Sequence, residues 1–170
     1  LVVQLFRNNW MGCVNGMIKA IGIGNRLMMD DGIAIAVLEN LKNNLESMVI
    51  EVIIGETDFQ FCFHQLKEDD FVIILDAAYS GAVAGSVHSC ELEEAITAYG
   101  ETNSHHDVSV FDLIRLYSKP IKGYLISIEI AEAGFGCELS EALKSIFNKI
   151  CLEVEKIIYE KVRRFPGYVE

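Results

Sequence analysis

The apolar run from Phe71 to Leu75, with the sequence FVIIL, constrains the fold of this chain more than any other segment. All of its residues are apolar, so it lacks the alternation of a strand that keeps one face in water. Such a run is typical of a strand that is buried on both faces, as in parallel sheets. We therefore expect a sheet with a layer of helices on each side.

Strand patterns and helix patterns alternate along the rest of the chain. Further strands are expected at Met17–Ile23, Met48–Ile54, Ser86–Leu92 and Tyr124–Ile130. Apolar residues at helical spacing predict helices at Gly32–Leu45, at Asp107–Tyr117 with Asp107 as the N-cap, and after the cap Ser140, with shorter helices at Phe59–Glu68 and Glu93–Ala98. This order predicts a three-layer α/β/α fold around a twisted, mainly parallel five-stranded sheet.

The composition indicates a globular protein and argues against several classes of partner. Hydrophobic residues make up 51% of the 170 residues, and the formal net charge is −11. Strong negative charge disfavours binding to nucleic acid and to anionic membranes, and no apolar run approaches the ~18 residues of a membrane span. We expect a monomer with a single domain at residues 17–170, preceded by an N-terminal extension of uncertain origin at residues 1–16.

The segment Gly22–Gly32, with the sequence GIGNRLMMDDG, follows an expected strand and precedes an expected helix. Its first glycines suggest a dinucleotide loop, but Leu27 occupies the place of the third glycine, and the acids that follow would repel a pyrophosphate. Asp30 and Asp31 open the helix, where the helix dipole favours acids. Capping explains one of them, and a functional role for the other is the alternative.

Asp76 ends the FVIIL run, at the edge where open α/β sheets bind their ligands. A carboxylate at the end of a central strand is costly to desolvate unless it has a partner, although a turn would also explain it. His105 and His106 lie just before a helix. One of these histidines, together with Asp31 and Asp76, would supply the two oxygens and one nitrogen that hold a divalent metal with open positions.

Other reactive side chains are expected to be structural. The five cysteines are odd in number, widely spaced and without a CxxC pair, which disfavours a disulfide framework or a zinc site and fits a reducing cytoplasm. Cys62, Cys90 and Cys137 lie in or beside apolar patterns, so we expect them in the core. His64 and His88 lack an acidic partner in a comparable setting, and no serine lies in a G-x-S-x-G motif.

Four segments match, in order and in spacing, the motifs of a known family. They are GIGNRLMMDDG, FVIILDAA, HHDVSVFDLI and IAEAGFGCELSEAL, and in them the chain resembles the hydrogenase maturation endopeptidases over Met17–Ile158. The resemblance implies a phosphorylase/hydrolase-like α/β/α fold. It also implies an endopeptidase that removes a C-terminal extension from the large subunit of nickel–iron hydrogenase after nickel insertion.

The same resemblance implies a site. The metal-sensing positions of the family fall on Asp31, Asp76 and His106, which are the expected catalytic and metal-binding residues. His106 is preferred to His105 because the DVSVFDLI that follows it keeps the family's spacing to its helix. Nickel is expected to arrive with the precursor of the hydrogenase large subunit, which is the expected partner. No organic cofactor, nucleic acid or membrane is expected.

Three positions depart from the family's pattern. Asp31 stands where glutamate is usual, Ala34 where glycine is expected, and Glu56 replaces the second glycine of a Gly-Gly-Thr turn. Glu56 is expected either to change the substrate groove or to add a ligand. These departures motivate an alternative, in which the chain is a non-catalytic binding or accessory protein of the same fold, or acts on another protein substrate.

Overall fold

The computed structural model describes residues 16–102 and 109–165. Its strands are β1 (Ile18–Ile23), β2 (Ile50–Glu56), β3 (Phe71–Ala78), β4 (Val87–Glu91) and β5 (Lys122–Glu129). Its helices are the short 3₁₀ helix η1 (Met29–Gly32), α2 (Ile33–Ser47), α3 (Phe59–Gln65), α4 (Leu92–Thr102), α5 (Val110–Leu116) and α6 (Glu141–Val162). Strands and helices alternate in the predicted order.

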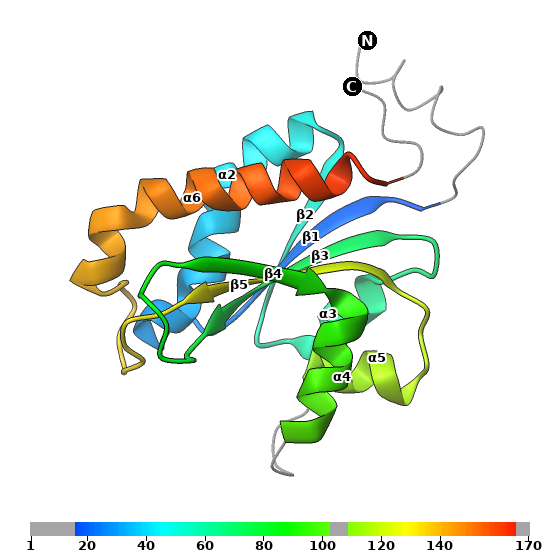
Figure 1. Cartoon of the computed structure of the whole chain (residues 1–170), viewed down its shortest axis with the longest axis horizontal. Coiled ribbons are helices and arrows are strands. Elements are labelled where there is room, and N and C mark those ends of the chain that lie inside the picture. The colour runs from blue at the N-terminus through cyan, green and yellow to red at the C-terminus, as the bar shows by residue number, and fades with distance from the viewer. Residues whose placement is uncertain (1–15, 103–108, 166–170) are drawn as a thin grey trace.

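The strands form one sheet in the order β2-β1-β3-β5-β4. β1, β2, β3 and β5 are parallel, and β4 joins β5 in the antiparallel direction at the edge. α2 and α6 cover one face of the sheet, and α3, α4 and α5 cover the other (Figure 1). The predicted three-layer α/β/α fold with a mainly parallel five-stranded sheet is confirmed.

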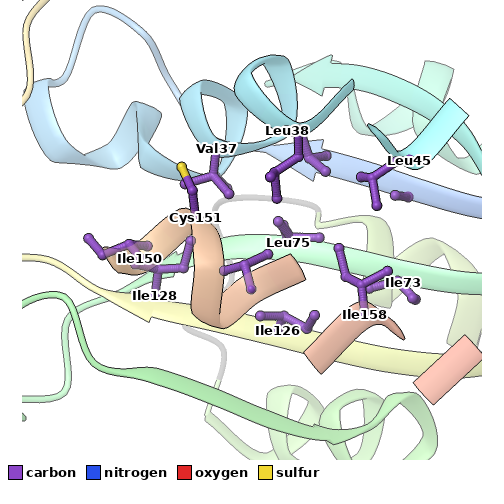
Figure 2. Close-up of a cluster of buried hydrophobic side chains, with 14 of the residues drawn as sticks. Val37, Leu38, Leu45, Ile73, Leu75, Ile126, Ile128, Ile150, Cys151 and Ile158 are labelled. Carbon is purple, nitrogen blue, oxygen red and sulfur yellow. The ribbon is translucent and has the colours of Figure 1, made fainter. Parts of the chain in front are cut away.

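The central strand β3 is buried on both faces, as its FVIIL run predicted. Phe71, Ile73 and Leu75 join the core under α2 and α6, and Val72 and Ile74 join the core under the other three helices. This alternation follows from the two-residue period of a strand. Figure 2 shows the first of these cores, with side chains of α2 and α6 packed over those of β3 and β5.

Some element boundaries differ from those predicted. α5 begins after Ser109, whose hydroxyl accepts a hydrogen bond from the Asp112 N–H while the Asp112 carboxylate accepts one from the Ser109 N–H. This capping box replaces the predicted cap Asp107, which lies outside the described residues. β3 runs on to Ala78, so Asp76 lies within the strand instead of ending it. Ser140 caps α6 as predicted.

The cysteines of the described residues are free, and two of them are fully packed in the cores. Burial, the largest cause, raises the pKa of both Cys62 and Cys151 to about 11, so neither thiol is an activated nucleophile. Cys137 is exposed, so its predicted place in the core is wrong: it lies on the loop between β5 and α6.

Within residues 16–102 and 109–165, no helix is long and apolar enough to span a membrane.

Candidate functional site

The order of the strands has a topological switch point between β1 and β3. From β1 the chain passes through α2 to β2 on one side, and β3 lies on the other side of β1. α2, which follows β1, and α3, which precedes β3, lie on opposite faces of the sheet (Figure 1). Open α/β sheets bind ligands beyond the carboxyl ends of the strands at such a switch point. Asp31 follows β1, and Asp76 lies near the end of β3, so both carboxylates lie at the carboxyl end of this strand pair.

Asp31 is held by the turn that leaves β1. The Asn25 N–H donates to Asp31 Oδ2 at 2.7 Å. Gly24 has a φ of +140°, and a Cβ placed on it would lie 2.1 Å from the Asp31 carbonyl oxygen, so this position requires glycine. The Asn25 side chain in turn accepts a hydrogen bond from the Leu27 N–H. The glycine turn therefore fixes a half-buried carboxylate at the mouth of the sheet.

Asp76 is the first residue of β3 beyond its ladder with β1, which ends where Leu75 pairs with Gly22. Its side chain is half-buried, and its Oδ1 accepts a hydrogen bond of 2.8 Å from the Ala77 N–H. η1, which carries Asp31, packs against β3. The structure therefore brings Asp31 and Asp76 to the same end of the same strand pair.

The predicted nitrogen ligand belongs to a segment before α5. His105 and His106 lie outside the described residues, and the described chain resumes at Ser109, three residues after His106. Across the described ranges, no three histidine, cysteine, aspartate or glutamate side chains are arranged to hold a metal ion. The set of Asp31, Asp76 and His106 thus stays a prediction, with its two carboxylates located.

His88 occupies an unexpected place relative to Asp76. Asp76 pairs with Ser127 on β5, and Ser127 pairs with His88 on β4, so the three residues form one row across the sheet. Paired residues project from the same face of a sheet. His88 is exposed, two strands away from Asp76, and it makes a well-matched control for tests of His106.

Asp30 does not cap a helix, in contrast to the capping interpretation. It is fully buried, and its carboxylate accepts hydrogen bonds from the Ala131 N–H, the Glu132 N–H, and both the N–H and the hydroxyl of Ser140, at 2.6 to 3.1 Å. The Ser140 hydroxyl also accepts from the Leu143 N–H and so caps α6. Asp30 therefore anchors the segment between β5 and α6, more than 100 residues away, to the turn that carries Asp31.

Glu129 is a second buried carboxylate at this edge, and the sequence reasoning missed it. Its carboxylate accepts hydrogen bonds from the N–H groups of Ser80, Gly81 and Ala82 and from the Ser80 hydroxyl. Burial raises its pKa, but these hydrogen bonds outweigh burial and hold the pKa below its usual value. The signal was available, because Glu129 follows an apolar strand run as Asp76 does.

Glu56 forms an ion pair with Arg26 on the surface. Its carboxylate accepts a hydrogen bond of 2.8 Å from Arg26 Nε, and Arg26 also binds both carboxylate oxygens of Glu39 on α2. The hydrogen bond from Arg26 holds the pKa of Glu39 below its usual value. Glu56 keeps a φ of +49°, the left-handed conformation that favours the glycine of the family pattern. Glutamate at position 56 thus preserves the backbone conformation of the turn and adds an ion pair with Arg26.

Ala34, the remaining departure, is fully buried where α2 packs on β1. A Cβ placed on Gly22 would lie 3.5 Å from the Ala34 carbonyl oxygen and 3.0 Å from a Leu38 methyl group. α2 therefore packs closely on β1 because Gly22 has no side chain, and the methyl group of Ala34 fits at this contact.

Comparisons with known proteins agree with this architecture. The model of a family described as hydrogenase maturation protease matches residues 35–157, a range that includes Asp76 and His106 and begins four residues after Asp31. No curated protein sequence matches the chain.

Several solved structures are similar to the chain. The hydrogenase maturating endopeptidase HybD from E. coli has a TM-score of 0.68 and 20% identity, over 85% of this chain and 93% of that one. The [NiFe] hydrogenase maturation protease HycI from Thermococcus kodakarensis KOD1 has a TM-score of 0.64 and 19% identity, over 90% and 98%. HybD from T. kodakarensis has a TM-score of 0.60 and 22% identity, over 83% and 99%. At these identities the likeness establishes the fold.

Proposed function

Because the chain belongs to the hydrogenase maturation protease family, we propose that it removes a C-terminal extension from the large subunit of a nickel–iron hydrogenase. The substrate is the precursor of that subunit after nickel insertion. The observation that carries the proposal is the placement of Asp31 and Asp76 at the switch point between β1 and β3. That is where an α/β fold presents its ligand-binding groups.

In this proposal Asp31, Asp76 and His106 bind the nickel that the precursor carries. Two carboxylates and one imidazole suit nickel among the divalent metals, and they leave coordination positions for the precursor's own ligands. The Asn25 N–H and the Ala77 N–H orient the two carboxylates before the substrate arrives. Groups held in place by hydrogen bonds lose less freedom on binding, which favours recognition of the metal.

The turn after β1 holds the carboxylate of Asp31, whose side chain is one methylene shorter than the usual glutamate. Its carboxylate oxygen lies only 3.9 Å from the point where Gly24 would carry a Cβ, so it stays close to the end of β1. A glutamate at this position would extend one methylene further from the turn. We therefore expect Asp31→Glu to keep activity and to change the affinity for the precursor more than the rate of cleavage.

The test is a processing assay with a purified nickel-loaded precursor. Wild type should release the C-terminal peptide, seen by mass spectrometry, whereas Asp76→Ala and His106→Ala should lower the rate by about 100-fold or more. His88→Ala is the matched control, since it removes an exposed histidine from the same row of the sheet as Asp76. Equal losses in His88→Ala and His106→Ala would contradict the assigned roles.

The same assay separates the alternatives. Binding of the precursor without cleavage by wild type would favour a non-catalytic accessory protein. Absence of both binding and cleavage would favour a protease with another protein substrate. Titration of nickel or cadmium into the protein without precursor gives an independent readout, because Asp31→Ala and His106→Ala should each weaken binding of the bare metal by about tenfold or more.

A further inference from the structure

The three most exposed large apolar side chains of the described residues lie on two loops at one edge of the sheet. They are Phe135, Val83 and Tyr79, with 89%, 80% and 76% of their surface exposed. Tyr79 and Val83 belong to the 79–86 loop, which follows β3, and Phe135 belongs to the 130–140 loop, which follows β5. Both loops begin at the carboxyl ends of strands, the same end of the sheet as Asp31 and Asp76.

The 130–140 loop is held firmly despite its exposed tip. The carboxylate of Asp30 binds both of its ends, through Ala131 and Ser140. The Gly136 N–H donates to the Leu27 carbonyl, and the Met29 N–H donates to the Gly136 carbonyl at 2.8 Å. Phe135 therefore projects into solvent from an anchored backbone, which is a costly place for an aromatic ring without a partner.

Glycines beside Phe135 bring the loop onto the turn that carries Asp31. A Cβ on Gly134 or on Gly136 would lie 3.1 Å from the side chain of Met29. Met29 is two residues before Asp31. The exposed ring is thus carried on a backbone that rests on the turn of the candidate site.

The 79–86 loop is held in the same way by the other buried carboxylate. Glu129 binds the backbone from Ser80 to Ala82, between the exposed Tyr79 and Val83. The Gly85 N–H also donates to the Glu129 carbonyl at 2.7 Å. The two loops adjoin, since the Ile130 N–H that opens one of them donates to the carbonyl of Ala78, which precedes the other. Figure 1 shows both loops at the same end of the sheet.

We infer that the 79–86 loop and the 130–140 loop form a docking surface for an apolar segment of the precursor chain next to its scissile bond. This inference rests on the proposed function. Two adjoining, hydrogen-bonded loops that expose apolar side chains suit an extended chain, which buries alternate side chains against such a surface. The surface is continuous with the site, because Asp76 lies three residues before Tyr79 and Met29 packs under the glycines beside Phe135.

Binding and turnover of the nickel-loaded precursor test this inference. Phe135→Ser and Tyr79→Ser should each raise KM about tenfold or more, as expected for exposed aromatic anchors, and leave kcat within about twofold. Phe135→Leu should restore most of the affinity. Leu116→Ser on α5 and Leu152→Ser on α6 are matched controls, because these leucines are 74% and 67% exposed on other surfaces.

Each outcome decides the inference. A rise in KM confined to the loop variants supports it. Normal KM values for Phe135→Ser and Tyr79→Ser in an active enzyme overturn it and leave the proposed function standing. Light scattering that shows a dimer dissolved by Phe135→Ser also overturns it, since the surface would then join two copies of this chain. If wild type neither binds nor cleaves the precursor, the proposed function fails and this inference fails with it.

Discussion

The two ends of the β1–β3 strand pair both carry acids, and they treat them in opposite ways. At the amino end, Lys19 of β1 and Asp70, which precedes β3, form a 2.6 Å ion pair with side chains only 4% and 1% exposed. Asp70 also accepts the N–H groups of Met17 and Lys67. At the carboxyl end, Asp31 is half-buried and takes part in no ion pair with any residue of the described ranges. At one end the buried charges neutralise each other, and at the other the carboxylate of Asp31 stays partly exposed.

This difference separates a buried ion pair from a carboxylate that is free to take part in the proposed site. A buried charge is tolerated only when its partner and its hydrogen bonds are complete, as they are for Lys19 and Asp70. A half-buried carboxylate keeps its capacity for a cation from outside the chain. Substitutions in the Lys19–Asp70 pair should therefore lower stability far more than substitution of Asp31, whose loss should affect the proposed binding of the precursor.

The largest expected effect comes from breaking the buried Lys19–Asp70 pair. Lys19→Met leaves the carboxylate of Asp70 buried without its cation, which should lower the free energy of unfolding by about 3 to 5 kcal/mol. Urea denaturation followed by circular dichroism measures the change. The double variant Lys19→Met/Asp70→Asn removes the stranded charge and should recover a large part of the loss. If Lys19→Met were as stable as wild type, the buried Lys19–Asp70 pair would not contribute to stability as described.

The second-largest expected effect distinguishes the contributions of Asp30 and Asp31 to stability. Asp30→Ala leaves buried N–H groups of Ala131 and Ser140 without an acceptor, and should cost about 2 to 4 kcal/mol. Asp31→Ala removes one hydrogen bond, from Asn25, and should cost about 1 kcal/mol or less. The same denaturation measurement compares them. Equal losses would contradict the division into a structural and a ligand-binding acid.

A pH series sharpens the role of Glu129. Its folded pKa lies below the usual value of 4.5, so the unfolded chain takes up a proton first as the pH falls. The stability that Glu129 contributes is therefore present above pH 4.5 and is lost as the pH falls through its folded pKa. Glu129→Gln should show a shallower loss of stability with acid than wild type, in thermal denaturation between about pH 3 and pH 6. Parallel curves for the two proteins would contradict this.

The smallest effect is expected at the exposed ion pairs around Arg26. The side chains of Arg26 and Glu56 are 39% and 51% exposed, so solvent screens their interaction. Arg26→Ala should lower the free energy of unfolding by about 1 kcal/mol or less. Denaturation at low and at high salt measures it, with Lys42→Ala as a control for another exposed pair on α2. If Arg26→Ala lost as much stability as Lys19→Met, the exposed ion pairs would contribute as much as the buried one, contrary to this prediction.

Local sequence patterns predicted most of the fold. The FVIIL run showed that β3 is buried on both faces, and Ser140 marked the start of α6, because strand period and helix capping depend on neighbouring residues. Near the end of α6, Ile158 is buried and Ile157 is half-buried against the same core, because a straight helix drifts relative to a strict seven-residue repeat.

The candidate site was predictable in part. Asp31 and Asp76 came from motifs at strand ends, and the strand order brings them together. The roles of Asp30 and Glu129 depend on hydrogen bonds to loops that a local pattern does not identify. Asp30 in particular has partners about 100 residues away, so its neighbours could only suggest a cap. His106 stays a prediction of the sequence, since it lies outside the described residues.

Asp30 and Asp31 are adjacent, so a single peptide unit connects the anchor of the 130–140 loop to the candidate site. Asp30 is tied to the 130–140 loop by four hydrogen bonds, and Asp31 begins one peptide unit later. Consecutive Cα atoms are about 3.8 Å apart across a rigid planar group. The carboxylate that anchors the loop that carries Phe135 and the carboxylate of Asp31 are therefore borne by residues joined through a single peptide plane.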